Sequence, residues 1–447
     1  MMSTAQRFAW LDGVSTVAMC AAALTLLPVN GAAASWGVAV RIAIVTVVCI
    51  VAFYYNDLYN FEAPHDFAQL FTRLCRALGI SALVLAGAYL MFPDMIVGGK
   101  LASYALLLTL LAVLSLRVFV YALAKRPPFS ERVLILGGGR FAGELARQIE
   151  TRPDLALRVV GCLAPTSGGY AAPRLGDYGD VGDVVRRLRP DRIVVAMPDR
   201  RGNLPVSDLL ACRFRGIEVE EGTRVFERLT GRLAVESLSP STLVFGDGFR
   251  VSRLQRALKR VMSVAMALIA LIAAAPLMAL IALAIKLESR GPVFFIQDRV
   301  GLRGSRFRLV KFRTMRDSGP AADSLWGRDN ASRVTRLGAV LRRYRLDELP
   351  QCLNILRGDM SLVGPRPEMA SNVATFSEVI PFYDLRHEVS PGLTGWAQIK
   401  AGYAMSSQEV THKLCYDLYY IKHMSVLFDL QILFDTVKFV LGGKRPG

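Results

Sequence analysis

Long apolar stretches alternate with polar segments along the chain and divide it into three parts. The first part contains four apolar stretches, residues 8–29, 36–56, 77–96 and 101–123. Each has about the 20 residues that a helix needs to cross the hydrocarbon core of a bilayer. The pattern therefore predicts a bundle of four transmembrane helices within residues 1–126.

Basic residues around these stretches predict how the helices are oriented. One side of the predicted bundle carries Arg7, Arg73, Arg76, Lys125 and Arg126, whereas the other side has little beyond Lys100. Lys and Arg favour the cytoplasmic side of a membrane. We therefore expect a multi-pass membrane protein whose N-terminus, 57–76 loop and later segments are all cytoplasmic.

The middle part, residues 127–250, has the pattern of a soluble α/β domain. The segment "ERVLILGGGRFAGELARQIE" (131–150) predicts a strand, a glycine turn and an amphipathic helix. Gly137, Gly139 and Ala142 match the G-x-G-x-x-A pattern of dinucleotide-binding turns, but the acidic residue expected about twenty positions later is missing. The favoured interpretation is a Rossmann-like domain whose glycines make the turn, and dinucleotide binding is the second.

A fifth apolar run, residues 261–285, begins the last part of the chain. Basic residues stand on both sides of it: Lys259, Arg260, Lys286 and Arg290. Pro276 removes a helix hydrogen bond in mid-run, so we expect a break at Ala275 and Pro276. A re-entrant helix that returns to the cytoplasmic side satisfies both basic flanks, and a proline-kinked fifth span is the alternative.

Composition narrows the function further. The formal net charge is +17, but aromatic residues are not interleaved with the basic ones, as a nucleic-acid surface would need. We expect no nucleic acid as a partner and assign the excess charge to anionic membrane lipids and phosphorylated substrates. The seven cysteines contain no C-x-x-C pair, so neither a disulfide framework nor a thiolate metal site is indicated.

Two adjacent acids, Asp347 and Glu348, are the most informative polar pattern, because residues 330–346 before them contain no acid. The simplest interpretation makes Asp347 the N-cap of a helix over about 348–356. Basic residues nearby in sequence favour a second interpretation: Lys311, Arg313, Arg342, Arg343, Arg345 and Arg366. Carboxylates among cations suggest a Mg²⁺ ion that bridges protein and phosphate, and an aspartate can also attack phosphorus.

From about Arg256 onward, the chain resembles the bacterial sugar transferase family, the monotopic polyprenyl-phosphate phosphoglycosyl transferases. The matching motifs are "LKR", "GPVFFIQDRVG" (291–301), "KFRTM" (311–315), "LDELPQCLNILRGDMSLVGPRPE" (346–368), "PGLTGWAQI" (391–399) and "YDLYYIKHMS" (416–425). The transmembrane and middle parts are similar to the large subclass that primes exopolysaccharide, capsule or O-antigen repeat units. The resemblance implies a mainly helical catalytic domain over 251–447, with 261–285 as its re-entrant membrane helix.

The resemblance implies a bacterial enzyme of the cytoplasmic (inner) membrane, with its catalytic domain on the cytoplasmic face. Such an enzyme transfers hexose-1-phosphate from a UDP-sugar to undecaprenyl phosphate and releases UMP. Glucose is the first expectation for the sugar and galactose the second. Self-association into a homo-oligomer and contacts with other polysaccharide-assembly enzymes are compatible with this role.

The resemblance also assigns roles to residues. Asp347 is the expected nucleophile of a ping-pong reaction through a phosphosugar-aspartyl intermediate, with Glu348 assisting and both near Mg²⁺. Arg366, Lys311 and Arg313 are expected to bind substrate phosphate. One departure concerns an aspartate that many members carry about three residues after the basic pair, where this chain has Met262 and Ser263.

Three other functions are compatible with parts of the pattern. Direct transfer would leave Asp347 only as a Mg²⁺ ligand. A non-enzymatic membrane scaffold or nucleotide-sensing regulator of polysaccharide assembly would have no need of paired acids in a basic pocket. A nucleotide-sugar epimerase or dehydratase would depend on residues 131–200, which lack both the ribose acid and a Tyr-x-x-x-Lys pair.

Overall fold

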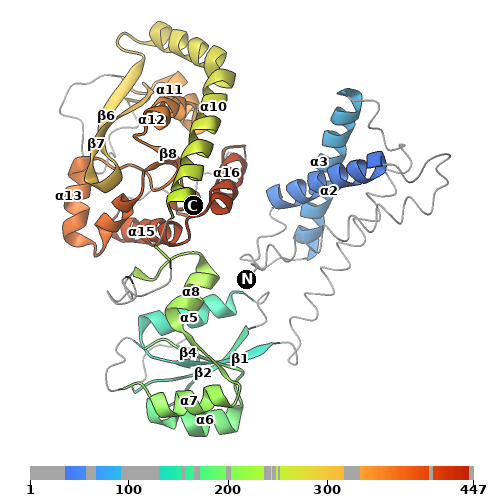
Figure 1. The fold of residues 1–447 in the computed structure, drawn as a ribbon, viewed down its shortest axis with the longest axis vertical. Helices are drawn as coiled ribbons and strands as arrows, with labels where there is room; N and C mark the ends of the chain where they lie inside the picture. The colour runs from blue at the N-terminus through green and yellow to red at the C-terminus, as the bar shows by residue number, and fades with distance from the viewer. Residues whose placement is uncertain are drawn as a thin grey trace, which may run out of the picture. The chain divides into compact units, whose positions relative to one another are not determined.

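The computed structural model describes residues 36–56, 67–91, 130–152, 157–165, 172–197, 203–235, 243, 248–249, 252–316, 333–401 and 406–441. The chain divides into two compact units, Met1–Gly222 and Thr223–Gly447 (Figure 1).

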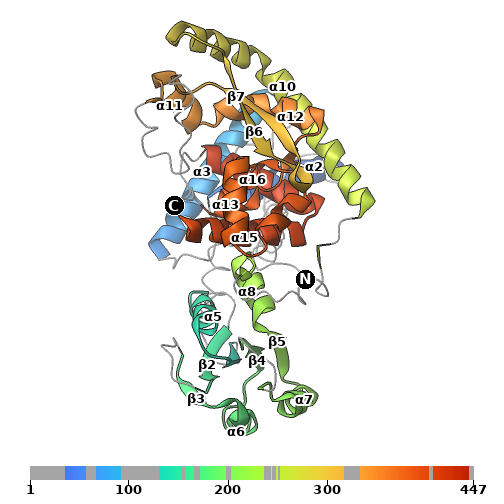
Figure 2. The same cartoon turned by 90° about the vertical axis from the view of Figure 1, so that its left-hand side faces the viewer.

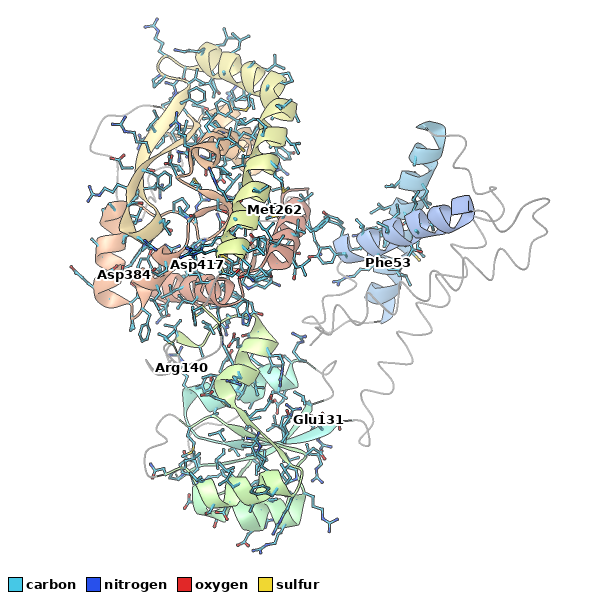
Figure 3. The ribbon with its side chains drawn as sticks, in the orientation of Figure 1. Phe53, Glu131, Arg140, Met262, Asp384 and Asp417 are labelled. Atoms are coloured by element: carbon cyan, nitrogen blue, oxygen red, sulfur yellow. The ribbon has the colours of Figure 1, made fainter. Side chains whose placement is uncertain are left out.

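Two helices of the predicted membrane part lie within the described residues. They are α2 (Trp36–Tyr55) and α3 (Phe67–Met91), and they contact each other. Phe53 in α2, labelled in Figure 3, and Leu74 in α3 are fully buried.

The helix at α2 matches the stretch predicted at 36–56, whereas α3 begins at Phe67, before the stretch predicted at 77–96. The stretches at 8–29 and 101–123 lie outside the described residues. The four-helix bundle therefore stays a prediction.

The first unit also contains a parallel five-stranded sheet, with the strand order β3-β2-β1-β4-β5. The strands are β1 (Glu131–Leu136), β2 (Leu157–Leu163), β3 (Arg174–Gly176), β4 (Arg192–Val195) and β5 (Glu218–Glu221). Helix α5 (Arg140–Glu150) covers one face, and α6 (Val181–Leu188) and α7 (Val206–Phe214) cover the other (Figure 1). The α/β prediction is confirmed, and the strand order is that of a doubly wound Rossmann-like sheet.

The glycine turn after β1 has a structural explanation. A Cβ atom at Gly137 would lie 2.3 Å from the carbonyl oxygen of Ala196, at the end of β4. Gly139 precedes α5 with a φ of 92°, which glycine adopts without strain. Both glycines are therefore needed for the fold, as the favoured interpretation of the motif requires.

The second unit is mainly helical, as predicted. Its elements are α8 (Gly222–Thr230), α10 (Arg253–Glu288), β6 (Phe294–Val300), β7 (Arg306–Phe312), α11 (Arg336–Arg343), the 3₁₀ helix η9 (Leu346–Gln351), α12 (Cys352–Arg357), β8 (Ser361–Val363), α13 (Ala370–Val379), the 3₁₀ helix η10 (Tyr383–Glu388), β9 (Gly392–Thr394), α14 (Trp396–Lys400), α15 (Ser407–Lys422) and α16 (Val426–Leu441). Strands β6 and β7 form an antiparallel hairpin, and β8 and β9 form a short parallel pair.

Helix α10 is the one helix within the described residues that is long and apolar enough to cross a membrane. Ser252 caps it, because its hydroxyl accepts a hydrogen bond from the amide of Gln255. The helix runs unbroken through Ala275 and Pro276 but bends visibly in its second half (Figures 1 and 2). The expected break at this pair is therefore not an interruption of the helix.

Both halves of α10 pack against the same unit. Ala267 lies in a core cluster with Ile355 of α12, and Ile281 lies in another with Phe312 of β7. The face between these contacts is apolar and exposed, as the 68% exposure of Ile272 shows. A helix of 36 residues is about 54 Å long, so a straight span would carry its two ends to opposite sides of a bilayer. Both halves of α10 therefore contact one and the same unit.

The segment 223–235 belongs to the second unit, although the sequence analysis assigned it to the middle domain. Leu233 and Val235 are buried in the cluster that contains Trp396. The indole of Trp396 donates a 2.8 Å hydrogen bond to the carbonyl oxygen of Gly231. Lys422 forms a 2.7 Å ion pair with Glu227 of α8. The second unit therefore includes residues before the predicted boundary at 250.

Candidate active site

The Asp-Glu pair lies in η9, which contacts β7. Arg345 precedes η9 in a left-handed conformation, with φ 57°. No side chain caps either η9 or α12, and Asp347 lies inside η9. The capping interpretation of Asp347 is therefore wrong, because the chain starts this segment as a 3₁₀ helix before Asp347.

Asp347 is a buried carboxylate without full hydrogen bonding. It is 8% exposed, and among the described atoms its Oδ1 has no hydrogen-bond partner. Burial and the neighbouring charge of Glu348 raise its pKa to about 6, against the opposing attraction of Lys311 and Arg342. A polar atom buried without a partner destabilises the fold, so this arrangement indicates a functional role.

Glu348 has the opposite environment. Its Oε1 accepts hydrogen bonds of 3.2 Å from Arg345 Nη1 and 3.2 Å from Arg366 Nη2. Burial disfavours the charge, but attraction to Arg366 and Arg345 outweighs it, so the pKa of Glu348 lies below its ordinary value. Two adjacent carboxylates thus have pKa values pushed in opposite directions, which is common where the two groups perform different tasks.

Lys311 of β7 contributes a cation beside this pair. Burial, with repulsion from Arg299 and Arg366, lowers its pKa to about 8, and attraction to Asp347 opposes the change. Its ammonium lies over the ring of Phe295, 4.9 Å from the centroid. The structure therefore brings together Asp347, Glu348, Lys311 and Arg366 from the predicted set.

Arg313, predicted to bind phosphate with Lys311, has a different position. Its guanidinium donates 2.9 Å hydrogen bonds to the carbonyl oxygens of Ser289 and Arg290 and to the hydroxyl of Ser289. The Arg313 side chain is 7% exposed, and its hydrogen bonds connect the residues after α10 to the end of β7. These contacts give Arg313 a structural role and do not support phosphate binding.

Arg366 is held by a buried pair that the sequence analysis did not identify. Arg386 Nη2 donates a 3.0 Å hydrogen bond to the carbonyl oxygen of Arg366 and a 2.9 Å bond to Asp417 Oδ2. Asp417, labelled in Figure 3, lies in α15, and Tyr383 accepts a further 2.9 Å bond from Arg386 Nη1. No local pattern signals this network, because Arg366, Arg386 and Asp417 lie far apart in the sequence.

Ser263 stands near the position where the resemblance leads one to expect an aspartate. Its hydroxyl lies 3.1 Å from that of Ser361, and the amide of Leu362 donates a 3.2 Å bond to it. A neutral hydroxyl therefore connects α10 to β8. This interface does not require the missing acid.

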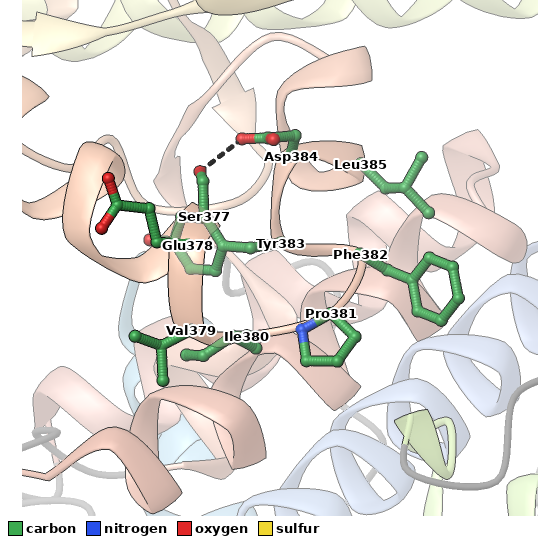
Figure 4. A pocket seen from close by; sticks show the side chains of 9 residues that line it. All are labelled: Ser377, Glu378, Val379, Ile380, Pro381, Phe382, Tyr383, Asp384 and Leu385. Carbon is green, nitrogen blue, oxygen red and sulfur yellow. Dashed lines mark hydrogen bonds between the residues drawn. The ribbon is translucent and has the colours of Figure 1, made fainter.

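An open pocket of about 320 Å³ lies elsewhere in the unit, between the end of α13 and η10 (Figure 4). Its lining residues are Ser377, Glu378, Val379, Ile380, Pro381, Phe382, Tyr383, Asp384 and Leu385. Ser377 donates a 2.6 Å hydrogen bond to Asp384, as Figure 4 shows. The lining contains two acids and no cation, so it is unsuited to phosphate and distinct from the Asp-Glu site.

The geometry around η9 defines a site for anionic substrates. A carboxylate with a raised pKa lies beside an ammonium group, and a second carboxylate is fixed by two guanidinium groups. Within the described residues, no group of three or more His, Cys, Asp or Glu side chains is placed to hold a metal. Two carboxylates still suit Mg²⁺, which commonly completes its shell with water and substrate phosphate.

Comparison with known proteins identifies the family. Residues 254–443 match the family described as bacterial sugar transferase, and residues 55–203 match one described as CoA-binding domain. The UDP-glucose:undecaprenyl-phosphate glucose-1-phosphate transferase of Escherichia coli K12 is 32% identical over 69% of this chain and 68% of that protein. The chain belongs to the bacterial sugar transferase family.

Two further relatives agree on the class but differ in the sugar that their names contain. The UDP-N-acetylgalactosamine-undecaprenyl-phosphate N-acetylgalactosaminephosphotransferase of Aeromonas hydrophila is 42% identical over 60% of this chain. The undecaprenyl-phosphate glucose phosphotransferase of Komagataeibacter xylinus is 35% identical over 69% of this chain. The matched segments span 62% and 59% of these two relatives, less than two thirds of each.

Proposed function

We propose that the protein transfers hexose-1-phosphate from a UDP-sugar to undecaprenyl phosphate and releases UMP, as the priming step of exopolysaccharide, capsule or O-antigen synthesis. The observation that carries the proposal is Asp347, a buried carboxylate with an unpartnered oxygen close to the cations of Lys311 and Arg342. Relatives named as undecaprenyl-phosphate sugar phosphotransferases support the substrate class.

The first step forms a covalent intermediate. A carboxylate oxygen of Asp347 attacks the sugar-bearing phosphorus, and the bond from this phosphorus to the bridging oxygen breaks. That oxygen keeps the electron pair and leaves as part of UMP. The raised pKa of about 6 still leaves Asp347 mostly ionised at neutral pH, and a raised pKa accompanies greater nucleophilicity.

The second step transfers the phosphosugar to the lipid. A phosphate oxygen of undecaprenyl phosphate attacks the same phosphorus, and the carboxylate of Asp347 departs unchanged. One phosphoric anhydride thus replaces another, so the protein has mainly to position the groups and neutralise their charge. Lys311 and Arg366 supply positive charge beside the reacting phosphorus.

We propose Mg²⁺ as the cofactor, held by Asp347 and Glu348. When bound, the ion would neutralise the charge of a substrate phosphate beside these two carboxylates. The unpartnered Oδ1 of Asp347 is a suitable hard ligand. Arg345 and Arg366 lower the pKa of Glu348 and so favour its ionised form, which can coordinate a cation.

The proposed location is the cytoplasmic membrane of a bacterium, with the second unit on the cytoplasmic face. Packing of both halves of α10 against this unit supports a re-entrant helix. Helices α2 and α3 lie in the part of the chain for which the multi-pass arrangement is predicted.

Turnover with a panel of nucleotide sugars tests this proposal. The purified protein in lipid nanodiscs with undecaprenyl phosphate and Mg²⁺ should release UMP from one or more of UDP-glucose, UDP-galactose and UDP-N-acetylgalactosamine. Glucose remains the first expectation, and the Aeromonas relative gives the reason to include the acetylated sugar. If the folded wild type released no UMP from any of them, the scaffold or regulator interpretation would be favoured.

A further inference from the structure

The β6–β7 hairpin places an aromatic side chain directly opposite Lys311. Phe295 pairs with Lys311 in the antiparallel register, so the two side chains share one face of the hairpin. Phe295 is nevertheless 40% exposed. An exposed phenyl ring thus stands at the edge of the cationic site, under the ammonium of Lys311.

This ring lies where the chain leaves the apolar helix. Helix α10 ends at Glu288, and β6 begins at Phe294. Two sets of hydrogen bonds fix the junction. Lys286 donates a 2.9 Å hydrogen bond to the carbonyl oxygen of Gly291, and Arg313 donates hydrogen bonds to Ser289 and Arg290. Exposed apolar side chains flank the junction, among them Leu287, Phe294 and Ile296. If α10 is embedded in a bilayer, this end of β6 lies at the membrane surface.

The polarity of the hairpin face changes along β6. Beyond Phe295, the same face carries Gln297 and then Arg299, whose guanidinium donates a 3.2 Å hydrogen bond to the carbonyl oxygen of Pro367. That carbonyl directly follows Arg366 in the chain. The face therefore runs from an apolar ring beside the predicted membrane to cations beside the Asp-Glu pair.

An amphiphile with an anionic head matches this order of groups. Its phosphate would meet Lys311, and its hydrocarbon chain would pass over Phe295 into the membrane. We infer that Phe295 is a binding and positioning residue for the first isoprene units of the polyprenyl phosphate acceptor. This inference rests on the proposed function and identifies the side chain through which the acceptor's chain is recognised.

General contact with membrane lipid is the competing explanation for an exposed phenylalanine. Ile296 offers a matched control, because it is the next residue in β6, is 57% exposed and points to the opposite face of the hairpin. A residue that only touches bulk lipid should respond to substitution as Ile296 does. A residue in the acceptor site should not.

The test separates the two half-reactions in nanodiscs, comparing wild type with Phe295→Ser, Phe295→Leu and Ile296→Ser. For Phe295→Ser, kcat/KM for undecaprenyl phosphate should fall about tenfold, the size expected for losing a good part of one apolar contact. The UMP burst without acceptor should change much less. Phe295→Leu, which keeps the site apolar and guards against misfolding, should show a smaller loss in the same parameter, and Ile296→Ser should behave as wild type.

An equal loss in both half-reactions for folded Phe295→Ser and Phe295→Leu would overturn the assignment, and so would the same acceptor defect in Ile296→Ser. A wild type that releases no UMP would instead refute the proposed function, and the assignment with it. A fully active wild type whose Phe295 variants keep their acceptor kcat/KM would refute the assignment alone.

Discussion

Replacing Asp347 by asparagine should make the protein more stable and much less active. Asparagine has nearly the same shape but no charge, so it removes the energetic penalty of an ionised group that is 8% exposed. An N-cap would behave differently, because asparagine caps a helix about as well as aspartate. The sign of the stability change therefore tests the buried environment itself.

The magnitude follows from the pKa of Asp347, which burial and Glu348 raise from the ordinary 3.8 to about 6. Each pKa unit corresponds to about 1.4 kcal/mol, so the ionised carboxylate costs the folded state up to about 3 kcal/mol. For a unit of this size, that corresponds to a rise in melting temperature of up to about 6 to 12 °C.

The dependence on pH gives a further check. A raised pKa means that the folded state holds its proton more tightly, so the wild type loses stability relative to Asp347→Asn as the pH rises from about 4 to about 6. Above about pH 6 the difference in stability between Asp347→Asn and the wild type reaches its full value, and below about pH 4 it vanishes. Thermal unfolding of both proteins in metal-free buffer at several pH values measures it.

Magnesium should partly reverse the difference in stability between the wild type and Asp347→Asn. Ligand binding stabilises only the protein that binds it, so Mg²⁺ should raise the melting temperature of the wild type more than that of Asp347→Asn. Activity should fall at least roughly a thousandfold, about 4 kcal/mol in transition-state stabilisation. An Asp347→Asn protein that is less stable than wild type at pH 8 without metal, or that keeps its turnover, would refute this reasoning.

Three further predictions concern pH, domain limits and topology. The rate of UMP release in the donor half-reaction should follow a bell-shaped pH profile, rising near pH 6 as Asp347 ionises and falling near pH 8 as Lys311 loses its proton; a flat profile from 5 to 9 would contradict it. A chain that starts at Thr223 should fold, whereas one that starts at Ser252 loses the buried Leu233 and Val235 side chains and should be destabilised by at least about 2–5 kcal/mol, and equal melting temperatures would count against this. A cysteine introduced at Arg290 should react only with reagents that reach the cytoplasmic side, and labelling from the periplasmic side would exclude a re-entrant α10.

Local sequence patterns predicted much of the fold. Apolar periodicity and the glycine turn predicted the strand β1 and the helix α5 that follows it, because neighbouring residues determine these features. The second apolar stretch was likewise confirmed as the helix α2. The limit near residue 250 was harder to place, since the burial of Leu233 and Val235 depends on helices that come much later in the chain.

The candidate site was predictable where its members lie close together in sequence. An acid-free basic segment before Asp347 and Glu348 indicated an anion site, and the structure places the predicted Lys311 and Arg366 beside this pair. The support of Arg366 by Arg386 and Asp417 was not predictable, because no periodic pattern links these positions. The role of Arg313 was likewise not predictable, because it differs from that of Lys311 although only one residue separates them.

The measurement that tests the central claim most directly is mass spectrometry of the intact protein after incubation with a labelled UDP-sugar substrate and Mg²⁺ but no lipid acceptor. The account predicts a hexose-phosphate adduct on the wild type that maps to the peptide containing Asp347, disappears when undecaprenyl phosphate is added and is absent from Asp347→Asn. Rapid UMP release in the presence of lipid with no adduct at any time would contradict it, and would show direct transfer with Asp347 serving only as a metal ligand.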